Sequence, residues 1–144
     1  MKIAVCSDEP HAVNFEIADF VKKLGHEVVL FGSLKTKQEE SWVSVTHNAA
    51  EFVSKGFCDE GIFFCWTGTG ASIAANKVPG IRAALCTDVE TAIGARRWNK
   101  ANVLVLSNRL VSIPLAKEIV EAWLSSSYNG EAESALTELK KLEF

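Results

Sequence analysis

Short apolar segments rich in β-forming residues alternate with helix-like segments along this 144-residue chain. Strands are expected over residues 2–7, 27–31, 61–65, 82–86 and 103–106, and helices over residues 13–24, 43–55, 72–77, 89–98 and 113–126. The strand segments are almost continuously apolar, which is typical of parallel strands covered by helices on both faces. The pattern predicts a Rossmann-like three-layer α/β/α sandwich around a five-stranded parallel sheet. One domain is expected over residues 1–144, with residues 131–144 a C-terminal helical extension.

Charge and composition exclude several classes of partner. The net charge is −3 and no basic run exceeds a pair of residues, so a nucleic-acid partner is not expected. No apolar stretch approaches the ~20 residues needed to span a bilayer, and no signal-peptide pattern precedes the first strand. The four cysteines are widely spaced, without a CxxC pair or a nearby histidine cluster. This indicates no metal, no cofactor, no disulfide framework and a reducing cytoplasmic location.

The segment that follows the third predicted strand carries the strongest functional signal. Residues 65–81 read CWTGTGASIAANKVPGI. Here a buried strand delivers Cys65 into a glycine-rich turn that opens a helix. A thiol beside free backbone N–H groups suits proton abstraction and stabilisation of the resulting oxyanion. Two simpler explanations stay open, namely a buried structural thiol and a tight turn that any such fold needs.

Polar residues also follow the other predicted strands, where parallel sheets bind their ligands. Asp8 follows the first strand and is equally suited to hold a ligand or to cap the next helix. Arg109 follows the fifth strand, where its guanidinium either pairs with a local acid or receives an anion. Together with Cys65, these side chains define the expected site.

These stretches resemble the ribose-5-phosphate isomerase type B and galactose-6-phosphate isomerase family of sugar-phosphate isomerases. The likeness covers residues 2–130 and is strongest over residues 65–82, where the family's CGTGxG, SIAANK and GIRA stretches recur almost unchanged. Ser7-Asp8, the stretch from Asn99 to Leu104 and Arg109-Leu110-Val111 add to it. The resemblance implies metal-independent aldose–ketose isomerisation of a sugar or sugar phosphate through a cis-enediolate. It also implies a homodimer or a dimer of dimers with active sites at the subunit interface.

The resemblance also assigns roles to residues. Cys65 is expected to be the base that moves a proton between C1 and C2, with Thr67 assisting beside the enediolate oxygen. Asp8 and Asn99 are expected to hold sugar hydroxyls. The backbone of the following turn is expected to form an anion cradle made of Gly68, Thr69, Gly70, Ala71 and Ser72.

Several positions depart from the family pattern. Glu9 stands where the family has a histidine, with His11 two positions further on as a possible substitute. Trp98 replaces the ring-opening histidine, Trp66 replaces a glycine and Trp42 replaces the family's usual tyrosine. These five residues are expected to line the sugar pocket, although the tryptophans equally suit a dimer interface.

The phosphate clamp of the family is largely missing. Residues 130–136 read GEAESAL where the family supplies two arginines, so that only Arg109 remains. Lost charge-assisted hydrogen bonds weaken the binding of a phosphate, and altered substrate choice follows, such as an unphosphorylated, short or open-chain sugar. Two alternatives stay open. One is a non-catalytic carbohydrate-binding or partner subunit of a hetero-oligomer, and the other is an ordinary ribose-5-phosphate isomerase that uses Arg96, Arg97 or Lys77 for the phosphate.

Overall fold

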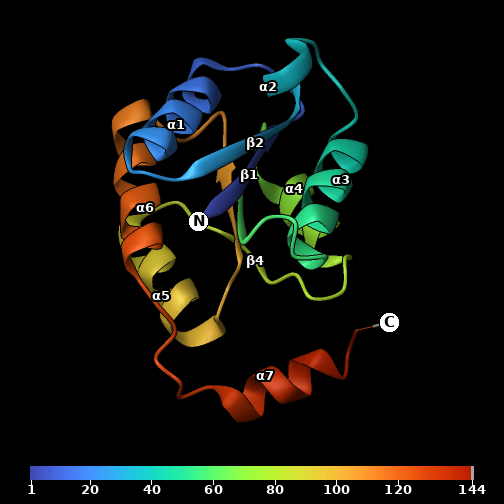
Figure 1. Cartoon of the computed structure of the whole chain (residues 1–144), viewed down its shortest axis with the longest axis vertical. Helices are drawn as coiled ribbons and strands as arrows, with labels where there is room; N and C mark the ends of the chain where they lie inside the picture. Colours follow the sequence, from blue (N-terminus) through green and yellow to red (C-terminus); the bar gives the residue numbers. More distant parts are fainter. Residues whose placement is uncertain (144) are drawn as a thin grey trace.

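The computed structural model describes residues 1–143 as a five-stranded sheet with helices on both faces (Figure 1). The strands are β1 (Lys2–Ser7), β2 (Glu27–Gly32), β3 (Glu60–Cys65), β4 (Ala83–Leu85) and β5 (Val103–Ser107). Neighbouring strands all run parallel, in the order β2-β1-β3-β5-β4. The predicted parallel sheet and the Rossmann-like α/β fold are confirmed.

Each predicted helix is present, with small shifts at its ends. The helices are α1 (Ala12–Lys23), α2 (Ser33–Thr36), α3 (Trp42–Ser54), α4 (Thr69–Asn76), α5 (Val89–Asn99), α6 (Ile113–Ser125) and α7 (Glu133–Lys140). The sequence pattern does not predict α2, because a helix of four residues is too short to show an apolar period. Helix α4 begins at Thr69 rather than Ser72, because residues of the glycine-rich turn themselves form its first turn.

The sheet separates two apolar cores, one on each face. Alternate side chains of each strand point to opposite faces, so Ile62 packs toward α1, α5 and α6 while Phe63 packs toward α3 and α4. The next pair follows the same alternation: Phe64 belongs to the first core and Cys65 to the second. This alternation therefore fixes the face on which the Cys65 thiol lies.

An ion pair is buried at the amino end of the sheet. Glu60 begins β3, and its Oε1 lies 2.5 Å from a guanidinium nitrogen of Arg96 in α5. The indole N–H of Trp123 donates to the other carboxylate oxygen at 2.9 Å. Burial nevertheless raises the pKa of Glu60, against the lowering effects of Arg96 and Trp123. These contacts tie α5 and α6 to the sheet.

The two ends of the sheet carry different segments. Helix α2 follows the carboxyl end of β2, whereas α7 lies at the opposite end of the molecule, below α5 (Figure 1). Within residues 1–143, no helix combines the length and the apolar character needed to cross a membrane.

Candidate active site

The Cys65 thiol lies at the carboxyl end of β3 and contacts the start of α4. Its Sγ accepts the backbone N–H of Gly68 at 3.1 Å and that of Ala71 at 3.4 Å. The residue is only 5% exposed. The N–H groups at a helix start carry partial positive charge and favour an anion beside them. The arrangement is therefore suited to a thiolate that exchanges a proton with a bound ligand.

The turn after Cys65 requires a glycine at position 68. Gly68 has φ of 81°, and a Cβ there would lie 2.5 Å from Cδ1 of Leu85. The N–H groups of Gly68 and Ala71 donate to the Cys65 sulfur. The N–H of Ser72 donates to the carbonyl of Gly68. The N–H groups of Thr69 and Gly70, at the first two positions of α4, face no intrahelical acceptor. These two groups are the donors that a developing oxyanion can use.

Thr67 stands beside this cradle with its side chain exposed. Its hydroxyl oxygen lies 2.6 Å from that of Thr69, and one of the two hydroxyls donates to the other. This bond holds the turn between Cys65 and α4.

The other three thiols belong to the interior. Burial raises the pKa of Cys6, of Cys58 and of Cys86, the last to about 12. Each is at most 2% exposed. They therefore stay protonated at neutral pH and serve as core residues.

Asp8 follows β1 beside the end of β3. The register pairs Ser7 with Phe64, so that Asp8 and Cys65 leave adjacent strands at the same edge. Asp8 is 9% exposed, and its Oδ1 has no hydrogen-bond partner among the described residues. Desolvation raises the pKa of Asp8, and the charges of Glu9 and Glu39 raise it further. A buried carboxylate oxygen without a donor is expected to receive one from a bound ligand.

Glu9, His11 and Trp66 form a small cluster at the same edge. Nε2 of His11 lies 3.0 Å from a carboxylate oxygen of Glu9. The imidazole stacks on the Trp66 indole, with ring centroids 5.7 Å apart and planes inclined by 27°. Trp66 follows Cys65 in the chain, so the cluster lies at the edge where β3 ends.

A chain of side-chain amides, which sequence reasoning does not predict as part of the site, fixes this loop. Asn14 accepts the backbone N–H of His11 and donates to Asn108 at 2.8 Å. Asn108 donates to the Ser7 hydroxyl, which in turn donates to the carbonyl of Glu9 at 2.6 Å. The one signal in the sequence is that Asn14, a polar residue, falls on the otherwise apolar side of α1. The structure buries it fully there.

Trp42 and Arg109 are the remaining predicted site residues that one chain places at the carboxyl edge of the sheet. The Trp42 ring covers the turn, since a Cβ on Gly70 would lie 3.0 Å from it. Arg109 follows β5, and its backbone N–H donates to the carbonyl of Trp66 at 3.0 Å. Its side chain is exposed and makes no hydrogen bond or ion pair within residues 1–143. Arg109 is thus a free cation at the edge that holds Cys65.

Trp98 and Asn99 lie elsewhere in the same chain. Helix α5 begins after the carboxyl end of β4 and runs back along the sheet, so its last residues reach the amino end. Trp98 is 58% exposed there and packs on Gly94 of its own helix. Asn99 borders a mostly apolar groove of about 500 Å³ beside α7. A single chain therefore does not bring either residue to Cys65.

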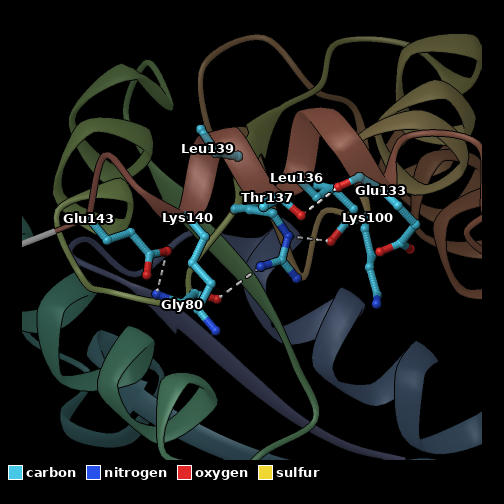
Figure 2. Close-up of a pocket in the computed structure, with 9 residues that line it drawn as sticks. Gly80, Lys100, Glu133, Leu136, Thr137, Leu139, Lys140 and Glu143 are labelled. Carbon is cyan, nitrogen blue, oxygen red and sulfur yellow. Dashed lines mark hydrogen bonds between the residues drawn. The ribbon is translucent and has the colours of Figure 1, made fainter.

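Helix α7 borders a second pocket, of about 350 Å³, at this amino end (Figure 2). Glu143 accepts the backbone N–H of Gly80 at 2.9 Å, and the Arg82 guanidinium donates to the carbonyl of Lys100 at 2.7 Å. Glu133, from the segment that lacks the family's arginines, lines this pocket. Within one chain, these acids are also remote from Cys65.

Three cations were expected as alternatives for binding a phosphate, and they differ in whether their side chains are free to do so. Arg96 is occupied by Glu60 and by the carbonyl of Ala101. Arg97 and Lys77 are exposed. The buried ion pair therefore leaves Arg96 unsuited to phosphate binding.

The chain is an α/β protein with a buried thiol at the carboxyl edge of its sheet, and comparison with known proteins shows the family to which it belongs. A family model described as ribose/galactose isomerase matches residues 3–141. The chain therefore belongs to this family of isomerases, as its motifs predict.

Named relatives act on sugars of different length. The chain is 37% identical over 125 residues to ribose-5-phosphate isomerase B of Escherichia coli strain K12, covering 87% of this chain and 83% of the relative. It is 38% identical over 114 residues to D-erythrulose-4-phosphate isomerase of Pectobacterium atrosepticum, covering 79% and 75%. The solved structure of ribose-5-phosphate isomerase B from Clostridium thermocellum is 41% identical, with a TM-score of 0.90 over 98% of this chain and 96% of that one.

Proposed function

We propose that the protein interconverts an aldose and a ketose through a cis-enediolate, without a metal, using Cys65 as the base. The observation that carries this proposal is the Cys65 thiol held by two backbone N–H groups beside the start of α4. The thiolate takes the proton from C2 of the open-chain aldose, and the N–H groups of Thr69 and Gly70 stabilise the oxyanion that forms. The thiol then returns the proton to C1, while the proton of the C2 hydroxyl passes to O1 and C2 becomes the ketone carbonyl. Thr67 assists beside the enediolate oxygen, and the unpartnered oxygen of Asp8 holds a sugar hydroxyl.

The substrate in this proposal differs from that of an ordinary ribose-5-phosphate isomerase. Asp8 and Glu9 add carboxylates at the edge that holds Cys65, and Arg109 is an exposed cation at that edge without an ion-pair partner among residues 1–143. Trp42 and Trp66 present aromatic surface. A short or unphosphorylated sugar fits such a rim better than a pentose phosphate that needs a full arginine clamp. A relative named for a four-carbon sugar phosphate supports a short substrate.

We further propose a homodimer or a dimer of dimers with the active site at the subunit interface. The placement of Trp98 and Asn99 at the opposite end of the sheet supports this, because only a second copy can bring them to Cys65. Exposed apolar side chains at both ends, Trp66 and Leu142 among them, support extensive contact between copies. Four free cysteines favour a reducing cytoplasm as the location.

The test is proton exchange in D₂O, followed by NMR over tetroses, pentoses, hexoses and their phosphates. Wild type is expected to exchange the C2 proton of its substrate and to form the ketose. Cys65→Ala is expected to lose both. The matched control is Cys58→Ala, which removes another buried thiol far from the site.

The outcomes separate the remaining hypotheses. Turnover that survives in Cys65→Ala contradicts the proposed base. Binding of a sugar without exchange by a folded protein favours the carbohydrate-binding or partner-subunit alternative. Efficient turnover of ribose 5-phosphate at low concentration contradicts the altered substrate choice.

A further inference from the structure

Strand β4 lies at one edge of the sheet, with β5 on its inner side. The backbone groups of successive residues in a strand point to opposite edges. The carbonyl of Arg82 faces β5, since it accepts the N–H of Asn102 at 3.0 Å. The N–H of Cys86 also faces β5 and donates to the carbonyl of Val105 at 3.1 Å. The N–H and the carbonyl of Ala83 therefore point outward, where a further strand would pair in a wider sheet.

A side-chain amide pairs with both of these outward groups. Asn76 is the last residue of α4, and its Nδ2 donates to the carbonyl of Ala83 at 3.0 Å. Its Oδ1 accepts the N–H of Ala83 at 2.8 Å. One amide group thus makes the two hydrogen bonds that the peptide groups of a neighbouring strand would make. The pair joins the carboxyl end of α4 to the sheet.

The packing of α4 gives this junction particular weight. The buried residues of the helix are Ala71, Ala74 and Ala75, whereas Ile73 is exposed. Each alanine presents a single methyl group to its neighbours, so it interdigitates with them less than a large side chain does. The hydrogen bonds at the two ends of α4 therefore contribute much of what fixes its position.

At its other end, α4 contacts the thiol through the N–H groups of Gly68 and Ala71. Cys65 is itself tied directly to the end of β5, because its carbonyl accepts the N–H of Asn108 at 2.9 Å. Helix α4 is tied to β5 through Asn76 and β4. The thiol and the N–H groups that contact it thus reach the same strand by two routes. Asn76 is the side-chain link in the second route.

We propose that Asn76 is a positioning residue for the reaction at Cys65. Its amide fixes α4 against β4 and so holds the N–H groups at the start of the helix on the sulfur. This inference rests on the proposed isomerase function. A helix of eight residues is about 12 Å long, so Asn76 lies one helix length from the thiol and acts only through α4.

The first test is steady-state kinetics on the substrate identified by proton exchange. Asn76→Ala removes both hydrogen bonds to Ala83 and is expected to lower kcat by roughly 10- to 100-fold, since a misplacement of about 1 Å can cost about 100-fold. KM is expected to change little, because the residues proposed to bind the sugar stay in place. Asn76→Asp keeps the shape of the side chain but opposes the Ala83 carbonyl with an oxygen, and is expected to lower kcat as well.

The matched control is Ser54→Ala. The Ser54 hydroxyl donates to the carbonyl of Pro79 at 2.6 Å, in the segment between α4 and β4. The variant removes a hydrogen bond of this segment and leaves the Asn76 amide in place. Its kcat and KM are expected to stay near the wild-type values.

The second test is amide hydrogen exchange followed by NMR, which needs no substrate. The acceptor of the Gly68 and Ala71 N–H groups is the Cys65 sulfur, so their protection from exchange reports on this contact. Asn76→Ala is expected to accelerate exchange at both amides toward the rates found in Cys65→Ala. The amides inside β3 are expected to exchange as in wild type. Asn76→Asp gives the same readout if Asn76→Ala does not fold.

The outcomes separate this inference from the proposed function. Unchanged kcat and unchanged exchange at Gly68 and Ala71 in both Asn76 variants overturn the positioning role. Faster exchange throughout the sheet also overturns it, because it shows a general loss of stability. A wild-type protein that isomerises no sugar, but in which Asn76→Ala accelerates exchange at these two amides alone, contradicts the proposed function and leaves the positioning of α4 by Asn76 standing.

Discussion

The side-chain amide of Asn14 donates a 2.8 Å hydrogen bond to Oδ1 of Asn108, 94 positions further along the chain. This bond joins the first turn of α1 to the end of β5. Because the same two residues contact His11 and Ser7, it also fixes the loop that carries Asp8 and Glu9. The geometry of the loop thus depends on a partly buried polar contact.

Replacing Asn14 by alanine is expected to lower the free energy of unfolding by about 1–3 kcal/mol, since it removes the hydrogen bonds of a fully buried amide and leaves the partly buried Oδ1 of Asn108 without this donor. Turnover is expected to fall as well, because the loop loses its anchor. Urea unfolding and initial rates measure the two effects. Asn48→Ala on the exposed face of α3 is the control and is expected to change stability by less than about 0.5 kcal/mol. Equal stability of the two variants would contradict the prediction.

Gly68→Ala is expected to destabilise the protein and to impair catalysis together. The new Cβ would meet Leu85 at 2.5 Å in a backbone conformation with φ of 81°, and the shift would displace an N–H that contacts Cys65. Gly25→Ala is the matched control, since Gly25 has φ of 96° but nothing within 4 Å. Thermal unfolding should show a loss of about 1 kcal/mol for Gly25→Ala from backbone strain alone, and a larger one for Gly68→Ala.

Asp8→Asn is expected to stabilise the protein at neutral pH while it lowers turnover. Burial raises the pKa of Asp8, so the folded state holds its proton more tightly than the unfolded chain does. The stability contributed by protonated Asp8 is full below the ordinary aspartate pKa and is lost as pH rises through the higher folded value. The advantage of Asp8→Asn over wild type should therefore begin near the ordinary aspartate pKa of about 3.9 and grow as pH rises through the higher folded value. Denaturant unfolding at several pH values measures it, and an advantage that shrinks with rising pH would refute this account.

Arg96→Met is expected to cost about 3–5 kcal/mol of stability, because it leaves the buried Glu60 carboxylate without its cation. The neighbouring Arg97→Met is the control, since that side chain is exposed. Trp123→Phe keeps the apolar packing but removes the indole donor to Glu60, and should cost about 1–3 kcal/mol. Similar unfolding midpoints for Arg96→Met and Arg97→Met would show that the ion pair does not stabilise the fold.

The strands and the Cys65 turn were predictable from the sequence for a local reason. An unbroken apolar segment such as Gly61–Phe64 followed by glycines has few alternatives to a buried strand that ends in a tight turn. The parallel order of strands then places Asp8, Cys65 and Arg109 at one edge without further information.

Contacts between distant residues were not predictable in this way. Whether His11 turns toward Glu9 and Trp66 depends on loop geometry, which no spacing encodes. The buried role of Asn14 depends on what Asn108 presents to it across the sheet edge. The one-turn helix α2 leaves no periodic signal at all.

Cys65 and Asn99 lie at opposite ends of the same sheet, so one folded chain does not bring them into contact. If a second copy supplies Asn99, two defective chains can rescue each other. Cys65→Ala and Asn99→Ala proteins, each inactive alone, should regain part of the wild-type activity when they are unfolded together and refolded as a mixture. A mixed pair holds one site in which both residues are intact. Under this proposal, activity belongs to the pair of chains and not to either chain alone.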